Sequence, residues 1–341
     1  MSESLLSIRD LAVDFPARAG VVRAVDHVSL DLAPGERLGL VGESGSGKSV
    51  LSRTVMGLTR ADSARISGQV VLDGVPVLEL SERRRRDLWG RRVAMVFQDP
   101  LNALHPITRI GDQVAEAVRR DPSVSRKDAQ ARAIELLELV GIPLAAKRAR
   151  ARAGELSGGM RQRVMIAIAM ACRPKLLIAD EPTTALDVTV QARILDLFDD
   201  LCSEFQIGLI LVSHDLRVVS NHTDRVAVMY GGRLAEVGPV RSVFSTPMMR
   251  YTQALLGAMP TSAGSTQSLP KAIPGLPPNL LNPSPGCRFA PRCEFALEDC
   301  RAAAPDLVEV AGEPLRRYAC WHPASGPDSS AATSMKSGAT R

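Results

Sequence analysis

A glycine-rich segment near the N-terminus constrains this chain more than any other feature. It reads Gly42-Glu43-Ser44-Gly45-Ser46-Gly47-Lys48-Ser49, and it lies between an apolar run at 37–41, typical of a buried strand, and a stretch of helical character that ends near Gly57. Glycines at these spacings let backbone N–H groups turn inward around an anion, and the helix N-terminus adds partial positive charge. Lys48 would reach the β- and γ-phosphates and Ser49 would bind Mg²⁺, so the segment predicts a nucleoside triphosphate site.

Length and composition set the outer limits. A chain of 341 residues exceeds the usual size of one domain, about 100–200 residues, so we expect two domains. No apolar run approaches the roughly 18–20 residues that span a bilayer, and the N-terminus lacks a secretory pattern. We therefore expect a cytosolic protein or one peripheral to a membrane. A net charge of +5 without a basic stripe interleaved with aromatic residues argues against a nucleic-acid partner.

The segments around the phosphate loop have strand character. Apolar and polar residues alternate at 5–15 and 25–32, and a further strand at 70–74 ends in a hairpin turn, which predicts an antiparallel sheet beside the nucleotide. Phe15 is either a platform for the adenine ring or an ordinary strand aromatic. The basic run 83–86 follows Ser81 in a polar helix; a solvated helix face is the favoured interpretation, with contact to phospholipid headgroups as the alternative.

The character of the chain becomes helical from about residue 101 to 155. Apolar residues recur at three- and four-residue spacing in 110–119 and 129–140, with a start signal at Ser125 and stop signals at Gly141 and Pro143. This predicts a helical subdomain inserted in an α/β core. The next segment precedes an apolar helix, and its serine and two glycines form a second anion site at a helix N-terminus: Leu156-Ser157-Gly158-Gly159-Met160.

Polar residues follow three short apolar runs. Gln98 follows 93–97, Asp180 and Glu181 follow 175–179, and His214 comes after 207–212. Asp180 could hold the Mg²⁺ shell through water, and Glu181 could polarise the water that attacks the γ-phosphate. Taken singly, each residue is ambiguous, and a lone histidine is more often structural. The position of His214, after the strand with the carboxylates, favours a γ-phosphate contact.

With these motifs in this order, residues 5–255 resemble the ATPase subunit of an ATP-binding cassette (ABC) transporter. The resemblance implies an α/β fold of the P-loop NTPase class, with an antiparallel β subdomain, an inserted helical subdomain at about 101–170, and ATP with Mg²⁺ as ligands. It also implies a role for each motif: adenine stacking for Phe15, Walker A for 42–49, the Q-loop for Gln98, the signature for 156–160, Walker B for Asp180, the catalytic base for Glu181, the D-loop for Asp187 and the switch histidine for His214.

The same resemblance implies an assembly. Cassettes of this family pair head to tail, so that Walker A of one and the signature of the other enclose ATP. The second cassette would be another copy or, as we favour, a related chain in a heterodimer. Two integral membrane permease subunits and an extracytoplasmic solute-binding protein would complete an importer, with this chain at the cytoplasmic face of the cell membrane and no nucleic acid involved.

Two stretches narrow the subfamily. Residues 157–166 and 97–106 are similar to the oligopeptide/dipeptide/nickel importer ATPases, and Met160 indicates the first of that family's two paired ATPases. Peptides are the favoured solute, with nickel or another small solute as the alternative. A non-transport cassette ATPase is one rival, although such proteins tend to carry two cassettes or a long coiled coil. A C-terminal module that senses redox state or metal, with ATP hydrolysis secondary, is the other. Segment 151–155 lacks the aromatic residue and proline usual in relatives, which affects local packing rather than nucleotide binding.

The C-terminal third has a different composition from the rest of the chain. We divide the chain into an ATPase domain at 1–257, a Pro-rich linker at 258–286, a four-cysteine domain at 287–323 and a disordered tail at 324–341.

Cys287, Cys293, Cys300 and Cys320 are separated by five, six and nineteen residues, spacings too irregular for a zinc ribbon. Four thiolates suit an iron–sulfur cluster, while zinc and merely packed free thiols remain alternatives. Segment 285–293 with Cys320 resembles the C-terminal extension of peptide-importer ATPases, which in some relatives binds a four-iron, four-sulfur cluster; the resemblance therefore favours the cluster.

Overall fold

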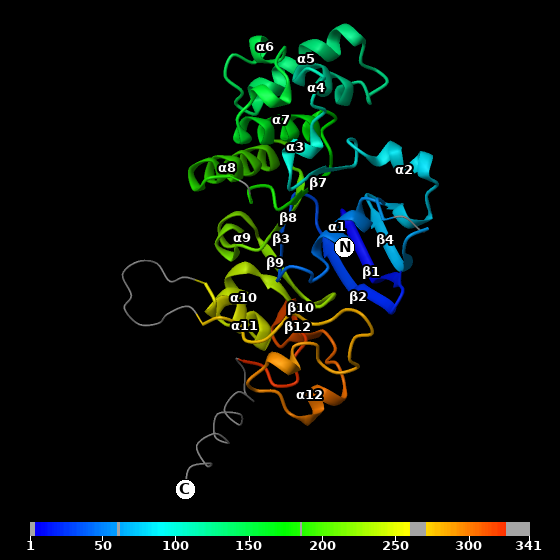
Figure 1. The fold of residues 1–341 in the computed structure, drawn as a ribbon, viewed down its shortest axis with the longest axis vertical. Helices are drawn as coiled ribbons and strands as arrows, with labels where there is room; N and C mark the ends of the chain where they lie inside the picture. Colours follow the sequence, from blue (N-terminus) through cyan, green and yellow to red (C-terminus); the bar gives the residue numbers. More distant parts are fainter. Residues whose placement is uncertain (1–3, 60–61, 185, 260–270, 325–341) are drawn as a thin grey trace.

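Two β-sheets form the body of the molecule, and helices pack around the larger one (Figure 1). The computed structural model describes residues 4–59, 62–184, 186–259 and 271–324. Within them, the larger sheet has eight strands in the order β11-β12-β10-β9-β3-β8-β7-β6, and the smaller has four in the order β2-β1-β4-β5. This is the α/β core with an accessory antiparallel sheet that the motifs predict.

Five strands of the larger sheet run parallel and end at one edge. They are β3 (Arg37–Val41), β6 (Val93–Val96), β7 (Leu176–Asp180), β8 (Gly208–Ser213) and β9 (Arg225–Tyr230). Nearly all of their residues are buried, as expected for continuous apolar runs in a parallel sheet covered on both faces. Because parallel strands share a carboxyl edge, the segments that follow β3, β6, β7 and β8 meet there.

The smaller sheet is antiparallel throughout, which confirms the prediction. Its strands are β1 (Leu6–Ala17), β2 (Gly20–Leu32), β4 (Arg65–Leu72) and β5 (Val75–Pro76). Asp73 and Gly74 join β4 to β5 with φ values of 49° and 75°, the left-handed conformations that a tight hairpin turn requires. β2 begins earlier than predicted, because the strand continues to the turn after β1.

A helical subdomain forms the end of the molecule at the top of Figure 1. It contains α3 (Pro100–Ala103), α4 (Ile110–Val118), α5 (Arg126–Leu139), α6 (Ala145–Arg148) and α7 (Gly158–Met170). The Ser125 hydroxyl accepts a hydrogen bond from the Asp128 amide (3.2 Å) and caps α5, as the start signal predicts. The predicted helices at 110–119 and 129–140 are therefore confirmed, the second beginning already at Arg126.

Segment 151–155, which contains no aromatic residue and no proline, is held by hydrogen bonds. The Ala151 carbonyl accepts a hydrogen bond from the Ile110 amide (2.9 Å), and Arg161 Nε donates to the Ala153 carbonyl (3.0 Å). The Ala153 side chain is buried. A backbone hydrogen bond thus connects this segment to α4, and a side-chain-to-backbone hydrogen bond connects it to α7.

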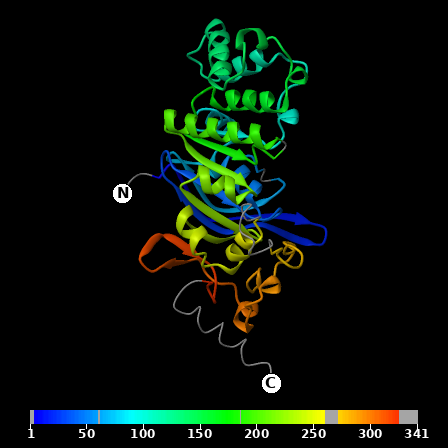
Figure 2. The ribbon, with the colours of Figure 1, turned by 90° about the vertical axis from the view of Figure 1, so that its left-hand side faces the viewer.

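The remaining described helices lie beside the two sheets and below them in the view of Figure 1 (Figures 1 and 2). They are α1 (Lys48–Val55), α2 (Glu82–Leu88), α8 (Val188–Phe205), α9 (Leu216–His222), α10 (Val240–Ser245), α11 (Arg250–Gly257) and α12 (Glu298–Ala302). In α2, Arg83, Arg84 and Arg86 are exposed, as a solvated face requires. Among the described helices, none is both long enough and apolar enough to cross a membrane.

The cysteine-containing segment continues the larger sheet. β12 (Glu313–Tyr318) pairs antiparallel with β10 (Arg233–Pro239), and β11 (Val308–Val310) follows at the edge. The segment that precedes the cysteines runs along β2, where the Arg23 amide donates to the Leu280 carbonyl (3.0 Å). Of the predicted linker at 258–286, residues 260–270 lie outside the described residues, as does the predicted tail except for Ala324.

A buried ion pair joins β12 to β10. Arg316 Nη2 lies 3.1 Å from Glu236 Oε1, and the two side chains are 2% and 0% exposed. The Glu236 carboxylate also accepts hydrogen bonds from the Met248 and Met249 amides, while burial raises its pKa above the usual value. Removing the arginine would leave a desolvated carboxylate without its countercharge.

We predict that Arg316→Ala lowers the free energy of unfolding by about 3–5 kcal/mol, since it breaks a buried pair by removing one partner. Urea denaturation followed by circular dichroism measures this value. Arg86→Ala is the matched control, because it breaks the exposed pair with Glu82 and should leave the free energy of unfolding almost unchanged. A loss below about 1 kcal/mol for Arg316→Ala would mean that the pair does not hold β12 in place.

Candidate active site

The phosphate loop is pressed between the two sheets at positions where only glycine fits. A Cβ on Gly42 would lie 2.1 Å from the Met229 carbonyl oxygen, and one on Gly47 would lie 2.3 Å from the Ala24 carbonyl oxygen. Both glycines have positive φ, 148° and 102°. Backbone on both sides therefore requires the glycines that the sequence pattern singles out.

Lys48 is held inside this loop by the loop's own carbonyls. Its Nζ donates to the carbonyl oxygens of Gly42 (2.7 Å) and Glu43 (2.9 Å). The side chain is buried, and burial lowers the pKa of the ammonium below its usual value, against the opposing effect of the nearby carboxylates. The ammonium is thus positioned at the start of α1, where phosphate oxygens would add to its hydrogen bonds.

Ser49 and Asp180 meet across the site. Ser49 Oγ donates to Asp180 Oδ1 (3.2 Å), connecting the first turn of α1 to the end of β7. Desolvation raises the pKa of Asp180, and the hydrogen bond from Ser49 opposes that shift. A hydroxyl and a carboxylate oxygen side by side are donors that suit Mg²⁺, which retains part of its water shell in nucleotide sites. These two residues would hold that ion.

Glu181 gathers polar side chains from three segments. Its Oε2 accepts hydrogen bonds from Gln98 Nε2 (3.2 Å) and Thr184 Oγ1 (3.0 Å), and it lies 3.4 Å from His214 Nδ1. The backbone at Glu181 has φ 48°, a left-handed conformation unusual for a side chain of this kind. The structure therefore brings together the predicted Gln98, Glu181 and His214, an arrangement that fits a base which orients an attacking water.

Thr184 is a contact that sequence reasoning missed. It lies three residues after Glu181 in the turn, and its hydroxyl also lies 3.4 Å from the Glu181 carbonyl oxygen. Threonine is common in turns, so its residue type alone did not mark it. The available signal was its spacing from Glu181. A threonine three residues after a carboxylate, in a turn, can place its hydroxyl within hydrogen-bonding distance of that carboxylate.

The signature residues lie in another part of the molecule. Ser157 is exposed and caps α7, where its Oγ accepts from the Met160 amide (3.4 Å). Both ribbon views place α7 in the helical subdomain, away from α1 (Figures 1 and 2). The structure of one chain therefore does not bring the second anion site to the first.

Asp187 and Phe15 have structural roles within this chain. Asp187 caps α8 by accepting from the Val190 amide (2.9 Å), while its neighbour Ala185 lies outside the described residues. Phe15 is half-buried in β1 opposite Val22, on the sheet that borders the phosphate loop. Their roles at the nucleotide remain predictions.

Comparison with known proteins identifies the family. The family model described as ABC transporter matches residues 25–184, and the one described as oligopeptide/dipeptide transporter, C-terminal region, matches residues 235–300. The oligopeptide transport ATP-binding protein OppD of Escherichia coli (strain K12) is 45% identical, covering 94% of this chain and 94% of its own. OppD of Bacillus subtilis (strain 168) is 44% identical over 94% of this chain and 89% of its own.

Solved structures agree on the cassette. The dimeric post-hydrolysis structure of the ATP-binding cassette MJ0796 bound to ADP and Pi has a TM-score of 0.62 and 25% identity, covering 69% of this chain and 99% of that chain. The chain belongs to the ATP-binding subunits of ABC transporters. The fold class, the ATPase activity and the oligopeptide/dipeptide branch predicted from the motifs are confirmed.

The C-terminal region of this ABC ATPase brings its four cysteines together. All four line one small cavity, together with Met249, Arg250, Phe289 and His322: Cys287, Cys293, Cys300 and Cys320. Burial raises the pKa of each thiol, that of Cys300 to about 11. Without a bound metal the thiols are therefore protonated at neutral pH.

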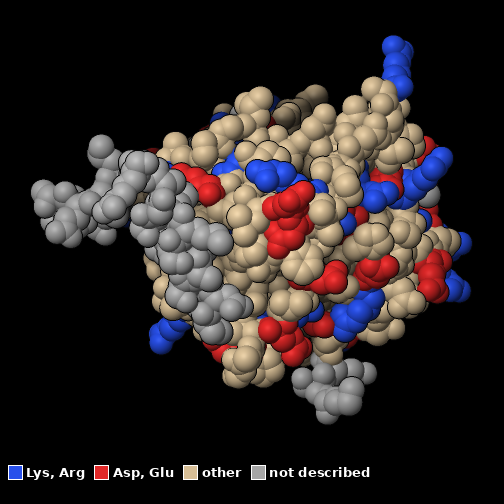
Figure 3. Space-filling view, turned by 90° about the horizontal axis from the view of Figure 1, so that it is seen from below, with Lys and Arg blue, Asp and Glu red and all other residues tan. Residues whose placement is uncertain are grey.

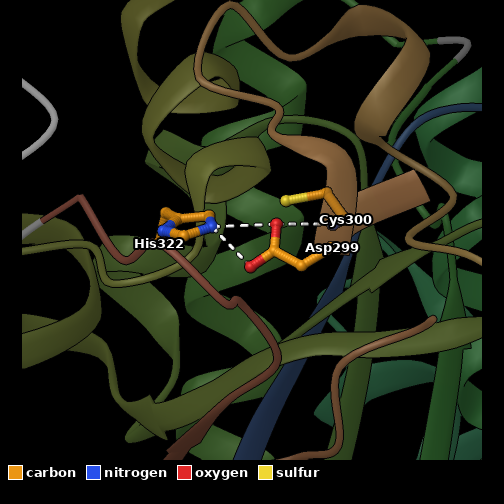
Figure 4. A group of neighbouring side chains, drawn as sticks. All are labelled: Asp299, Cys300 and His322. Carbon is orange, nitrogen blue, oxygen red and sulfur yellow. Dashed lines mark hydrogen bonds and ion pairs between the residues drawn. The ribbon is translucent and has the colours of Figure 1, made fainter. Parts of the chain in front are cut away.

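A carboxylate and an imidazole lie beside one of these thiols (Figure 4). His322 Nε2 lies 2.8 Å from Asp299 Oδ2, and the ligand atoms of Asp299, Cys300 and His322 are all within 4.8 Å of one another. Sequence reasoning missed His322, although it follows Cys320 by two residues. This group is a further set of donors for a metal ion.

We predict that Glu181→Gln in the ABC ATPase lowers steady-state ATP hydrolysis about 10²–10⁴-fold, because an amide cannot accept the proton of the attacking water. Phosphate release measures the rate, and nucleotide binding should persist, with ATP-bound dimers accumulating. Glu204→Gln, an exposed change on α8, is the control. Normal turnover in Glu181→Gln would rule out the base.

Proposed function

We propose that this ABC ATPase powers the import of dipeptides or oligopeptides. One combination of observations carries the proposal. The chain has a nucleotide site with its carboxylates and polar side chains assembled at the sheet edge, and residues 235–300 match the C-terminal region of oligopeptide/dipeptide transporters. The relatives named as oligopeptide transport ATP-binding proteins match over most of both chains, which supports the same solute class here.

Within one site, each residue has a defined task. Lys48 neutralises phosphate oxygens, and Ser49 and Asp180 would hold Mg²⁺, which would balance the charge that develops as the γ-phosphoryl group leaves. Glu181 accepts the proton of the water that attacks the γ-phosphorus, while Gln98 and His214 orient that water and the γ-phosphate. The Gln98, Thr184 and His214 contacts keep the carboxylate aimed at this position.

The site is completed by a second cassette. Ser157 and the glycines after it present N–H groups at an exposed helix start that lies away from the phosphate loop of the same chain (Figure 1). A head-to-tail dimer applies this helix start to the nucleotide of the partner, and the related cassette MJ0796 was solved as a dimer. We favour a related second ATPase as partner, with two membrane permeases and an extracytoplasmic solute-binding protein, at the cytoplasmic face of the membrane.

Affinity purification from detergent-solubilised native membranes tests this assembly. We expect two multi-span membrane proteins and a second cassette ATPase to copurify with the chain. After reconstitution in liposomes with the binding protein, ATP should drive peptide accumulation, and the Glu181→Gln complex should not. Uptake of nickel without uptake of peptide would show that the transported solute is nickel and not peptide. Copurification of the chain with ribosomes and without membrane proteins would refute a transport role.

We also propose that the four cysteines hold a four-iron, four-sulfur cluster. Their shared cavity and their soft thiol donors, one buried and three half-buried, support this assignment, and the thiols would release protons on ligation. Such a cluster would supply a rigid cross-link between segments 287–300 and 320. Zinc bound with His322 is the competing occupant, because one thiol, one imidazole and one carboxylate lie within reach of a single ion.

We predict that anaerobically purified protein contains about four iron ions and four sulfide ions per chain. Its visible absorption spectrum should be that of a four-iron, four-sulfur cluster. Cys293→Ser should lose most of the iron, because one ligand is removed. Cys172→Ala is the control, since this half-buried thiol lies at the end of α7. One zinc per chain and no iron would exclude the cluster.

A further inference from the structure

The second residue of the phosphate loop, Glu43, is tied to the cysteine-containing segment. Arg292 Nη1 donates to Glu43 Oε2 (2.6 Å) and Arg292 Nη2 to Glu43 Oε1 (3.0 Å), so the two side chains form a bidentate pair. The arginine side chain is 7% exposed. It directly precedes Cys293 and lies 249 residues from Glu43 along the chain.

The arginine itself is fixed by further acceptors. Its Nε donates to the Pro274 carbonyl (2.7 Å), and its Nη1 also donates to Tyr230 Oη (3.2 Å). The hydrogen bonds to Glu43 and Tyr230 raise its pKa, so the guanidinium remains charged. Because acceptors bind its Nε and both of its Nη atoms, the planar guanidinium group has a single orientation. This orientation also fixes that of the Glu43 carboxylate.

The backbone of Glu43 is held by the same wall of the protein. Its amide donates to Tyr251 Oη (2.9 Å), and Tyr251 is fully buried. The Tyr251 ring packs on Tyr230 and on Phe289, with centroid separations of 4.3 Å and 5.4 Å. Phe289 lies between the first two cysteines of the cavity. Main chain and side chain of Glu43 are therefore both anchored by residues outside the phosphate loop.

A second arginine beside a cysteine supports the other side of the loop. Arg288, next to Cys287, donates to the Gly231 carbonyl and to Asp26 Oδ2 (2.6 Å). The following residue, Gly232, donates its amide to the Ser46 carbonyl (2.9 Å). Segment 287–293 therefore reaches the phosphate loop by two routes. Arg292 contacts Glu43 directly, and Arg288 contacts the turn after β9, which in turn contacts Ser46.

We propose that Arg292 is a positioning residue for nucleotide binding. By fixing Glu43 it holds the carbonyl that accepts from Lys48 Nζ (2.9 Å), and so keeps the ammonium and the loop N–H groups in their phosphate-binding arrangement. The affinity for ATP thus depends on the C-terminal segment. This inference rests on the nucleotide site of the family and is independent of the transported solute and of the metal proposed for the cysteines.

The test compares full-length variants for ADP affinity by calorimetry and, in the assembled complex, for KM and kcat with MgATP. Arg292→Ala should weaken ADP binding and raise KM about fivefold or more, with a smaller change in kcat. Arg292→Lys should recover part of the affinity, since it keeps the charge but loses the fork. Lys271→Ala, which breaks the exposed pair with Glu294 in the same region, should bind ADP like the wild type.

A double-mutant cycle with Glu43→Gln separates positioning from general stabilisation. The double variant should bind ADP about as weakly as Arg292→Ala alone, because both changes remove the same contact. Metal content and melting temperature are recorded for every variant. ADP affinity within twofold of wild type in Arg292→Ala, or fully additive effects in the cycle, would overturn the proposal and leave a salt bridge that serves only stability.

Discussion

Backbone contact on both sides of the phosphate loop is the constraint on which the rest of the site depends. The loop leaves β3 and passes so close to Met229 and Ala24 that a single Cβ would collide with a carbonyl oxygen on either side. Met229 belongs to β9 of the larger sheet and Ala24 to β2 of the smaller sheet. The geometry of the loop therefore depends on the relative position of the two sheets. Any shift of one sheet against the other would change the direction of the N–H groups of the loop.

The hydrolytic part of the site is built from strand ends instead of from one contiguous loop. Glu181 adopts a left-handed backbone conformation after β7, and its carboxylate is satisfied by a glutamine that follows β6 and a histidine that follows β8. Neighbouring parallel strands make this convergence automatic. The strain at Glu181 is offset by these contacts and by the turn hydrogen bond to Thr184, which is how unusual backbone geometry persists at functional positions.

The motifs assigned to the nucleotide site could be recognised in the sequence because each of them is local. A glycine spacing, an apolar run with a terminal carboxylate and a serine before a helix all act within a few residues, and the order of the parallel strands then brings them together. The contacts that the sequence did not reveal join distant segments. Arg316 with Glu236 and Arg292 with Glu43 are separated by 80 and 249 residues, and no periodicity encodes such pairs.

Composition was also a weak guide in the C-terminal third. Proline, serine and glycine at 258–286 predict a linker, but composition does not show that Leu280 and Asn282 bond to β2 or that β12, beyond the linker, joins the central sheet. Short polar segments of this kind have little apolar patterning, because they are held largely by backbone hydrogen bonds to strands that precede them in the sequence. His322 escaped notice for a related reason, because its partner Asp299 lies 23 residues away and not at metal-ligand spacing.

These long-range contacts converge on one short segment. Residues 287–293 supply two of the four cysteines and, directly beside them, the two arginines that reach Gly231 and Glu43. The backbone that sets the geometry of the thiols therefore also sets the position of both guanidinium groups. A close-packed segment of seven residues cannot adjust one set without moving the other. The physical consequence is that the cysteine cavity and the phosphate loop share a support, although they lie at opposite ends of the sequence.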